Sequence, residues 1–184
     1  MISVEGGGLL FTHGPVQGAF VIDPECRFDE RGYFARLWCV DELQSEGLLA
    51  RIAQINTGVS LRKGTLRGMH FQTAPNQEVK VVRCVRGAVF DVVVDLRPDS
   101  STYRSWMAVE LTAENGKLMY VPEGCAHGYQ TLADDTELIY LTSARYSAGS
   151  ANGVRFDDPS FAIEWPAPVT AISHQDRTWP DYIV

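Results

Sequence analysis

A period-two alternation of apolar and polar side chains dominates the middle of the chain and predicts β-strands. Over residues 88–96, one set of alternate positions is wholly apolar, whereas the other contains Asp91 and Asp95. This is the pattern of a strand with two different faces. Residues 79–86 form a second predicted strand, and Arg86-Gly87 has the composition of the turn between the two. Similar runs predict further strands at residues 105–111, 118–121, 128–131 and 138–142.

One stretch has the pattern of a helix. Residues 41–49 carry it, and Asp41 is placed where it can cap the N-terminus. There is no internal repeat or long linker, and a length of 184 residues suits one domain, residues 1–184, with a full core. Many short strands separated by turns indicate an all-β sandwich or barrel, a class that includes the jelly rolls. Alternation does not distinguish a jelly roll from another sandwich.

Composition narrows the classes of function. Apolar residues make up 45% and charged residues 21% of the chain, as in ordinary soluble proteins. No apolar run approaches the ~18 residues of a membrane span, so no membrane association is expected. The N-terminal residues lack the basic and apolar regions of a signal peptide, so a cytoplasmic protein is expected. The four cysteines form no C-x-x-C pair, which argues against a zinc ribbon or a thioredoxin-like site.

Charge is negative overall but unevenly distributed. The net charge of −7 argues against a nonspecific nucleic-acid binder. Residues 27–86 nevertheless contain ten Lys or Arg against six Asp or Glu, a local charge of +4, which leaves −11 for the rest of the chain. On composition alone, this is either chance clustering or an anion-binding site in an otherwise acidic protein.

Two segments, residues 64–72 and 121–128, resemble the two motifs of the cupins. The first cupin motif contains His-x-His followed by a downstream Glu, and the second reads Pro-x-Gly-x-x-His. Here the first motif reads His70-x-Gln72. The other characteristic positions are kept as Glu78, Gly87, Pro122, Gly124 and His127. The resemblance implies a cupin-type jelly-roll barrel with short flanking helices.

The exchange of a histidine for Gln72 changes the expected chemistry. A transition-metal site needs about three or four good ligands, and a neutral amide is a poor substitute for imidazole. His70, Glu78 and His127 remain as a possible metal-binding set, so a metal-dependent cupin dioxygenase or isomerase stays open as an alternative. The favoured interpretation is a barrel without a metal, in which His70 is available for proton transfer.

Seven motifs, in order and at similar intervals, closely resemble the dTDP-4-dehydrorhamnose 3,5-epimerase family. The resemblance extends from about residue 21 to residue 176. The motifs are residues 29–34, 54–56, 66–72, 80–84, 121–128, 138–140 and 173–176. The implied reaction is epimerisation at C3, at C5 or at both, on a nucleotide-linked 4-keto-6-deoxyhexose, with the dTDP-linked sugar as first choice.

The resemblance also implies catalytic roles. A ketone at C4 acidifies the hydrogens on C3 and C5. His70 matches the base that removes such a proton, and imidazole, with an unperturbed pKa of ~6.5, suits that task. Asp176 matches the carboxylate that orients this histidine. Tyr140 matches the acid that returns a proton to carbon, and Lys80 matches the cation placed beside the C4 oxygen.

Substrate-binding roles follow in the same way. The positions that match nucleotide and diphosphate contacts are Arg31, Gln54, Asn56, Arg67 and Tyr146. Arginine suits phosphate because its planar fork donates two parallel hydrogen bonds, which favours the anion-site interpretation of the positive segment. His127 matches a second histidine of the sugar site. No P-loop or Rossmann fingerprint is present, so no cofactor is expected. The family resemblance implies a homodimer.

Strand parity conflicts with two of these roles. His70 and Arg67 are an odd number of residues apart and should point to opposite faces of a regular strand. Both can face the substrate only if the strand is irregular or the chain turns before Gly68, and a glycine at that position is compatible with a bulge.

Several family positions are not kept. Arg36, Arg145 and Ala151 replace residues that the family usually has around the nucleotide. GDP- or CDP-linked sugars therefore stay open as substrates. A non-catalytic sugar-nucleotide binder is a further hypothesis, and it fits poorly with all four catalytic matches being present.

Overall fold

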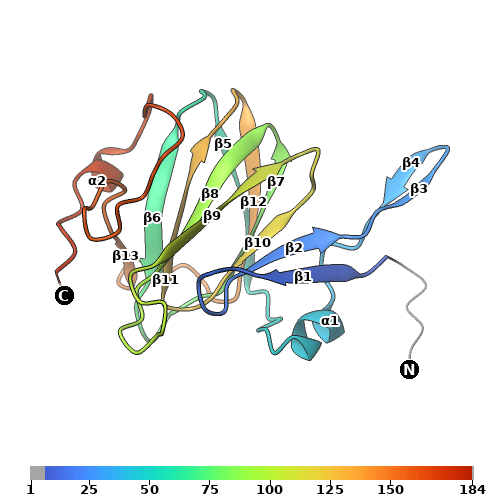
Figure 1. Cartoon of the computed structure of the whole chain (residues 1–184), viewed down its shortest axis with the longest axis horizontal. Helices are drawn as coiled ribbons and strands as arrows, with labels where there is room; N and C mark the ends of the chain where they lie inside the picture. The colour runs from blue at the N-terminus through green and yellow to red at the C-terminus, as the bar shows by residue number, and fades with distance from the viewer. Residues whose placement is uncertain (1–6, 184) are drawn as a thin grey trace.

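Two facing β-sheets form the body of the protein, shown in Figure 1 as a computed structural model that describes residues 7–183. The first has the strand order β1 (Leu9–His13), β2 (Phe20–Pro24), β10 (Leu118–Val121), β7 (Lys80–Arg86), β12 (Thr136–Thr142) and β5 (Gln54–Ser60). The second has the order β13 (Ala151–Gly153), β6 (Leu66–Gln72), β11 (Cys125–Thr131), β8 (Ala88–Asp95) and β9 (Trp106–Thr112). Pairing is antiparallel and joins strands distant in sequence, which is the arrangement of a jelly roll.

The core has three layers because both faces of each sheet are covered. Between the sheets, apolar side chains such as Val82, Val93 and Leu138 interdigitate. A second cluster packs Leu43 of helix α1 (Val40–Ser45) onto the outer face of the six-stranded sheet. A third packs Phe161 and its neighbours from the C-terminal segment onto the five-stranded sheet. Strands buried on both faces read as nearly continuous apolar runs, which explains the composition of β8.

The predicted strands and the turn at Arg86-Gly87 are confirmed, with boundaries shifted by a few residues at most. The predicted helix is shorter than expected, and the prediction that Asp41 caps it is wrong. Cys39 occupies the N-cap with an extended backbone, which places Asp41 inside the first turn. There its charge lies near the positive end of the helix without capping it. No helix in the described part of the chain is long and apolar enough to span a membrane.

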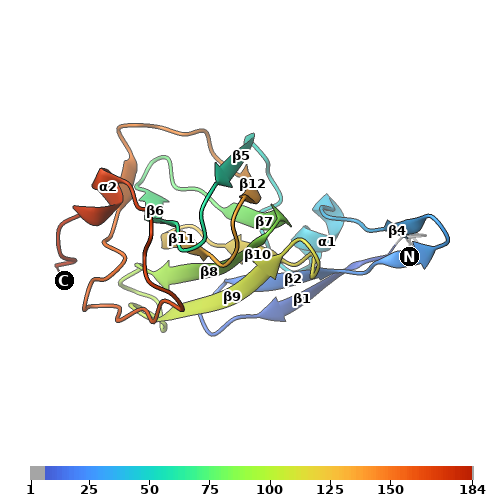
Figure 2. The same cartoon turned by 90° about the horizontal axis from the view of Figure 1, so that it is seen from above.

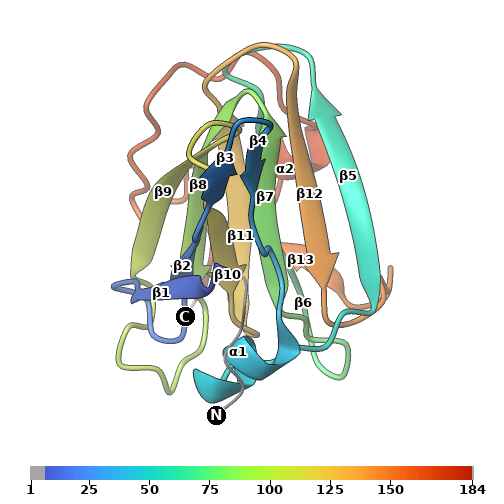
Figure 3. The same cartoon turned by 90° about the vertical axis from the view of Figure 1, so that its right-hand side faces the viewer.

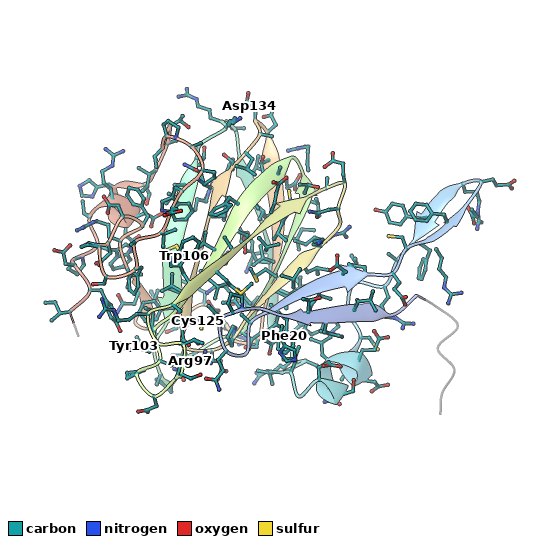
Figure 4. All side chains as sticks on the ribbon, viewed as in Figure 1. Phe20, Arg97, Tyr103, Trp106, Cys125 and Asp134 are labelled. Atoms are coloured by element: carbon teal, nitrogen blue, oxygen red, sulfur yellow. The ribbon has the colours of Figure 1, made fainter. Side chains whose placement is uncertain are left out.

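A two-stranded hairpin, β3 (Arg27–Asp29) and β4 (Gly32–Phe34), projects from the body in Figure 1 and lies in front of the sheets in the end-on view of Figure 3. Its side chains stand apart from the rest of the molecule in Figure 4. Three of them are exposed aromatic rings, with 76% of Phe28, 55% of Tyr33 and 67% of Phe34 accessible. A projecting group of apolar side chains of this kind is typical of a surface that meets another protein.

The C-terminal segment lies at the opposite end of the molecule from this hairpin (Figures 1 and 2). It carries the short helix α2 (His174–Arg177) beside β6. A parallel bridge between Thr65 and Ala171 holds the segment in place, and the Leu66 N–H donates to the Ala171 carbonyl over 2.8 Å. These bonds bring the last motif of the sequence next to the third.

Candidate active site

Two adjoining cavities, of about 290 Å³ and about 500 Å³, lie between the sheets where β5, β6, β7 and β12 face each other. The residues that line both are Asn56, His70, Lys80, Tyr140 and Tyr146. Gln54 lines the smaller cavity, and Arg67 and His127 line the larger one. Eight of the ten side chains singled out in the sequence therefore gather in one region. Asp176 lies directly behind His70, and Arg31 lies elsewhere.

His70 and Asp176 form a close pair. Nε2 of His70 is 2.6 Å from Oδ1 of Asp176. Roughly half of the histidine side chain is accessible, whereas 6% of the aspartate side chain is. A carboxylate that accepts the proton on Nε2 leaves Nδ1 as the ring nitrogen with a free lone pair. The pair can therefore take up a proton and stabilise the resulting imidazolium.

The position of Asp176 is set by the cap of helix α2. Ser173 is the N-cap, and its hydroxyl accepts a hydrogen bond from the Asp176 N–H over 3.0 Å. The second carboxylate oxygen of Asp176 accepts from the Gly68 N–H over 3.2 Å. Burial by itself would raise the pKa of Asp176, but its bonds with His70 and Gly68 hold that pKa below its usual value. Asp176 thus stays ionised as a fixed negative partner for His70.

A bulge in β6 resolves the parity conflict between Arg67 and His70. His70 pairs with His127 and Arg67 pairs with Tyr129, so β6 has one extra residue between these two positions. Gly68 lies at the irregularity with φ +131°, and a Cβ there would come within 2.5 Å of the Gly128 Cα. Close backbone approach therefore requires glycine at this position. The predicted irregularity is confirmed, and both side chains line the larger cavity.

Lys80 is paired inside the smaller cavity. Its Nζ is 2.6 Å from Oε1 of Glu78, and both side chains are largely buried. The amide of Gln72 donates to the other oxygen of Glu78 over 3.2 Å. Gln72, which replaces a cupin histidine, thus hydrogen-bonds to Glu78, and Glu78 in turn forms the ion pair with Lys80. Sequence reasoning considered Glu78 as a metal ligand, and the structure instead makes it the counter-ion of Lys80.

A second histidine–aspartate pair was missed by sequence reasoning. Nε2 of His127 is 2.9 Å from Oδ2 of Asp91, and both side chains are almost completely buried. Burial raises the pKa of Asp91, and the neighbouring His127 opposes that rise. Among the described residues, Oδ1 of Asp91 has no hydrogen-bond partner. The sequence did contain a signal for this pair, since Asp91 lies in a strand composed mostly of valines. A carboxylate buried in such a strand requires a polar or charged partner, which could have been sought among the histidines.

Tyr140 reaches into the space between the sheets from β12. Its ring lies edge-on to that of His127, with centroids 6.5 Å apart. A Cβ at Gly58 would be 3.5 Å from the Tyr140 hydroxyl, so that hydroxyl lies over the backbone of β5. Burial raises the pKa of Tyr140 far above its usual value, with the positive charge of Arg67 acting in the opposite direction. The phenol therefore keeps its proton across the working pH range.

The open rim of the smaller cavity is organised by backbone contacts. The side-chain oxygen of Gln54 accepts from the Tyr146 N–H, and Gln72 Oε1 accepts from the Ser147 N–H over 2.7 Å. Asn152 and Trp179 also line this cavity and were not singled out in the sequence. Their positions depend on how the loop after β12 and the C-terminal segment fold back.

Arg31 is not brought to the cavities within the chain. It lies in the turn of the projecting hairpin, where it pairs with Asp29, and 84% of its side chain is accessible. Arg36, which replaces a common family residue, pairs with Glu42 of α1. The assignment of Arg31 to the substrate therefore stays a prediction.

The metal-binding alternative can be tested against the donor set. His70, Glu78 and His127 are each engaged by a different partner, namely Asp176, Lys80 and Asp91. Within residues 7–183, no three His, Cys, Asp or Glu side chains are grouped so as to hold a metal ion. The arrangement suits proton transfer better than ligation.

Comparison with known proteins agrees with this geometry. A family model described as dTDP-4-dehydrorhamnose 3,5-epimerase matches residues 13–183. The chain is 41% identical over 172 residues to dTDP-4-dehydrorhamnose 3,5-epimerase of Methanothermobacter thermautotrophicus, covering 92% of each. It is 41% identical over 163 residues to dTDP-4-dehydrorhamnose 3-epimerase of Streptomyces niveus, covering 88% of this chain and 78% of that one.

A solved structure gives the same result. The dTDP-4-dehydrorhamnose 3,5-epimerase of Bacillus anthracis, crystallised with TDP and PPi bound, superimposes with a TM-score of 0.91 at 34% identity. The match covers 95% of this chain and 100% of that one. The predicted cupin-type jelly roll is thereby confirmed. By sequence and by fold, the chain belongs to the dTDP-4-dehydrorhamnose 3,5-epimerase family.

Proposed function

We propose that this protein epimerises the sugar of a nucleotide-linked 4-keto-6-deoxyhexose, with dTDP-4-dehydro-6-deoxyglucose as substrate and dTDP-4-dehydrorhamnose as product. The observation that carries the proposal is the placement of two proton-transfer groups on opposite walls of one cavity. His70 belongs to β6 of the five-stranded sheet, and Tyr140 belongs to β12 of the six-stranded sheet. A sugar ring between them meets a base on one face and an acid on the other.

Inversion at carbon requires this two-sided arrangement. His70 removes the proton next to the ketone, and Asp176 stabilises the imidazolium that forms. The negative charge passes to the C4 oxygen, where Lys80 is placed to stabilise it. Tyr140 then delivers a proton to the same carbon from the other face. No electrons are gained or lost overall, so the reaction needs no redox cofactor.

The diphosphate is assigned to the side of Arg67. Its guanidinium lines the larger cavity next to His70 and is the cation best placed for a phosphate group that follows the sugar. The TDP bound to the Bacillus anthracis relative supports dTDP as the nucleotide. The Streptomyces niveus relative is named a 3-epimerase, so reaction at C3 alone is one of the outcomes to be tested. We expect the enzyme to act in the cytosol, as its sequence predicts.

We also propose that the protein works as a homodimer. The hairpin carrying Phe28, Tyr33 and Phe34 leaves these rings exposed and places Arg31 far from its own cavities. Docking of this hairpin on a second copy would bury the rings and bring Arg31 to the nucleotide end of the other site. Light scattering should give twice the chain mass, and Arg31→Ala should raise KM more than it lowers kcat. A monomer with full activity would contradict this proposal.

The decisive experiment is solvent exchange with a panel of substrates. Proton NMR in deuterium oxide should show loss of the C3 signal, the C5 signal or both from the dTDP-linked 4-keto sugar, and formation of the epimer. GDP- and CDP-linked 4-keto sugars measure nucleotide preference. His70→Ala should abolish exchange, whereas the control His13→Ala, at an exposed imidazole on β1, should leave it unchanged. Full exchange in His70→Ala would overturn the role of His70, and no exchange by the wild type with any sugar would overturn the proposed function.

A further inference from the structure

Gln72 is a buried amide at the junction of two parts of the site. It is 4% exposed and lines the smaller cavity at the end of β6. On one side lies the loop after β12, which carries Tyr146, the residue that sequence resemblance assigns to the nucleotide. On the other side lies the ion pair of Glu78 and Lys80. The proposed chemistry gives Gln72 no task.

The amide of Gln72 is hydrogen-bonded at both of its ends. Its Oε1 accepts from the Ser147 N–H over 2.7 Å. Its Nε2 donates to the Asn76 carbonyl over 2.9 Å, and the Arg145 carbonyl and Oε2 of Glu78 are each 3.2 Å from the same nitrogen. Two amide hydrogens therefore serve three acceptors. Through one side chain, these contacts join the turn after β6, the loop after β12 and a carboxylate of the cavity.

The partners allow only one orientation of this amide. A backbone N–H can only donate, so the side-chain oxygen of Gln72 must face Ser147. The two backbone carbonyls and the carboxylate of Glu78 accept, so the NH2 group must face them. A rotation of the amide by half a turn would place its oxygen against three acceptors and its NH2 group against a donor. The side chain is therefore fixed with its NH2 group toward Glu78.

Glu78 passes this restraint on to Lys80. Oε2 of Glu78 accepts from Gln72, while Oε1 is 2.6 Å from Nζ of Lys80. Because both oxygens are engaged, the carboxylate cannot rotate without breaking one of the two contacts. The side chains of Glu78 and Lys80 are 9% and 13% exposed, so water does little to replace a contact that is lost. The position of the ammonium group thus depends on Gln72.

We infer that Gln72 is a positioning residue that holds two parts of the site in register. Through Glu78 it sets the ammonium of Lys80, and through the Ser147 N–H it holds the loop that carries Tyr146. This inference rests on the proposed function, because it needs Lys80 beside the C4 oxygen and Tyr146 at the nucleotide. The first link acts on the chemical step, and the second acts on substrate binding.

A second buried glutamine has bonds of a purely structural kind. Gln130 of β11 is 0% exposed, donates to the Ala167 carbonyl over 2.8 Å and accepts from the Ala167 N–H over 3.1 Å. Both bonds go to one backbone position of the C-terminal segment, and no charged side chain takes part in them. The same substitution at Gln72 and at Gln130 therefore separates the loss of a buried amide from the loss of the link to Glu78.

Gln72→Met removes both links with little change in volume. kcat should fall roughly 10- to 100-fold, as expected when a hydrogen bond to a charged group is lost, and KM should also rise. Deuterium exchange and epimerisation should fall by the same factor, because Lys80 stabilises the enolate through which both pass. Gln130→Met is the control, and it should lower the melting temperature but keep kcat within about threefold of wild type.

Gln72→Glu separates the two links. The introduced carboxyl group can still accept from the Ser147 N–H, so KM should change less than in Gln72→Met. While protonated, it can also donate to Glu78, but once ionised it faces a second carboxylate. Two carboxylates that share a site keep one proton to a higher pH than an isolated carboxyl group does. The ratio of variant to wild-type kcat should therefore fall as the pH rises from about 6 to about 9.

Measurement of wild type at each pH removes the contribution of the other titratable groups of this cavity, which are His70, Lys80, Tyr140 and Tyr146. The double variant Gln72→Glu with Glu78→Gln again has one carboxyl group in the pair. Its kcat ratio to wild type should no longer fall over this pH range, whereas a merely structural role of Gln72 would give both variants the same pH profile.

Two results would each overturn the inference. One is a kcat ratio for Gln72→Glu that stays constant with pH. The other is a kcat for Gln72→Met within about threefold of wild type, which decides the question if Gln72→Glu does not fold. Both leave the proposed function intact, because wild type still epimerises. A wild type without exchange contradicts the proposed function itself, and the inference falls with it.

Discussion

Nε2 of His70 lies 2.6 Å from Oδ1 of Asp176, although 106 residues separate the two along the chain. The contact exists because the C-terminal segment returns to β6 and is tied there by the Thr65–Ala171 bridge. Ser173 then caps α2 and directs the aspartate inward. Residues 173–179 of the C-terminal segment are therefore part of the site.

Asp176→Asn should lower kcat by about 10²–10⁴-fold, because an amide neither stabilises the imidazolium nor selects the ring tautomer that leaves Nδ1 free. KM should change much less, because the aspartate lies behind His70 and away from the substrate. Steady-state kinetics, together with melting temperatures, tests this. Asp181→Asn removes an exposed carboxylate of the same segment, paired with Arg155, and serves as the control with near wild-type activity. Activity of Asp176→Asn within threefold of wild type would contradict the pairing role.

Tyr140→Phe should separate exchange from epimerisation. His70 can still form the enolate, but the opposite face lacks its proton donor. Substrate recovered from deuterium oxide should therefore carry deuterium with its original configuration, while net epimerisation falls by about 10²-fold or more. NMR of the recovered sugar measures both quantities. Equal losses of exchange and epimerisation would argue that Tyr140 binds substrate and does not act as the acid.

Lys80 and Glu78 should behave as one buried unit. Lys80→Met leaves the Glu78 carboxylate without its counter-ion and is expected to destabilise the fold by about 3 kcal/mol. Adding Glu78→Gln should recover most of that loss but none of the activity, because the cation beside the C4 oxygen stays absent. Urea unfolding and kinetics on the two variants check this. Lys117→Met, at a partly exposed lysine 3.5 Å from Asp23, is the control and should cost little stability. Recovery of activity in the double variant would contradict the role of Lys80.

Asp95 should make folding stability depend on pH in acid. Burial would raise its pKa, but hydrogen bonds from Arg97, Ser100 and Thr102 lower it to about 2. A carboxyl whose folded pKa lies below the ordinary value of 3.8 stabilises the fold above about pH 4. That contribution is lost as the pH falls from about 4 toward 2.

The corresponding measurement compares wild type and Asp95→Asn by urea unfolding at several pH values. The variant should be less stable at pH 7 by at least about 1 kcal/mol, and the difference should shrink as the pH approaches 3. Asp99→Asn, at an exposed position in the same loop, should show no such change. A difference that stays constant with pH would mean that ionisation of Asp95 does not contribute.

Much of the fold was predictable because strand periodicity is a local property. The alternation over residues 79–96 gave both strands and the turn at Gly87, and the odd spacing of Arg67 and His70 predicted the irregularity at Gly68. The cap of α1 was predicted wrongly because the N-cap depends on where the chain leaves its extended conformation. In the structure that point is Cys39, one turn before Leu43, which packs against the sheet.

The sequence by itself identifies the candidate catalytic residues, because they lie in contiguous motifs. It also indicates which side chains share a face of a strand, because side chains alternate along a strand. It does not identify the partners of those residues. Asp91 reaches His127 from the adjoining strand of the same sheet, and Asp176 reaches His70 from the C-terminal segment. Glu78 lies only two residues before Lys80, but their pairing as buried counter-ions appears only in the folded chain. Burial then decides which groups keep their charge, because the cost of an ion depends on the surrounding atoms and not on its neighbours in the chain.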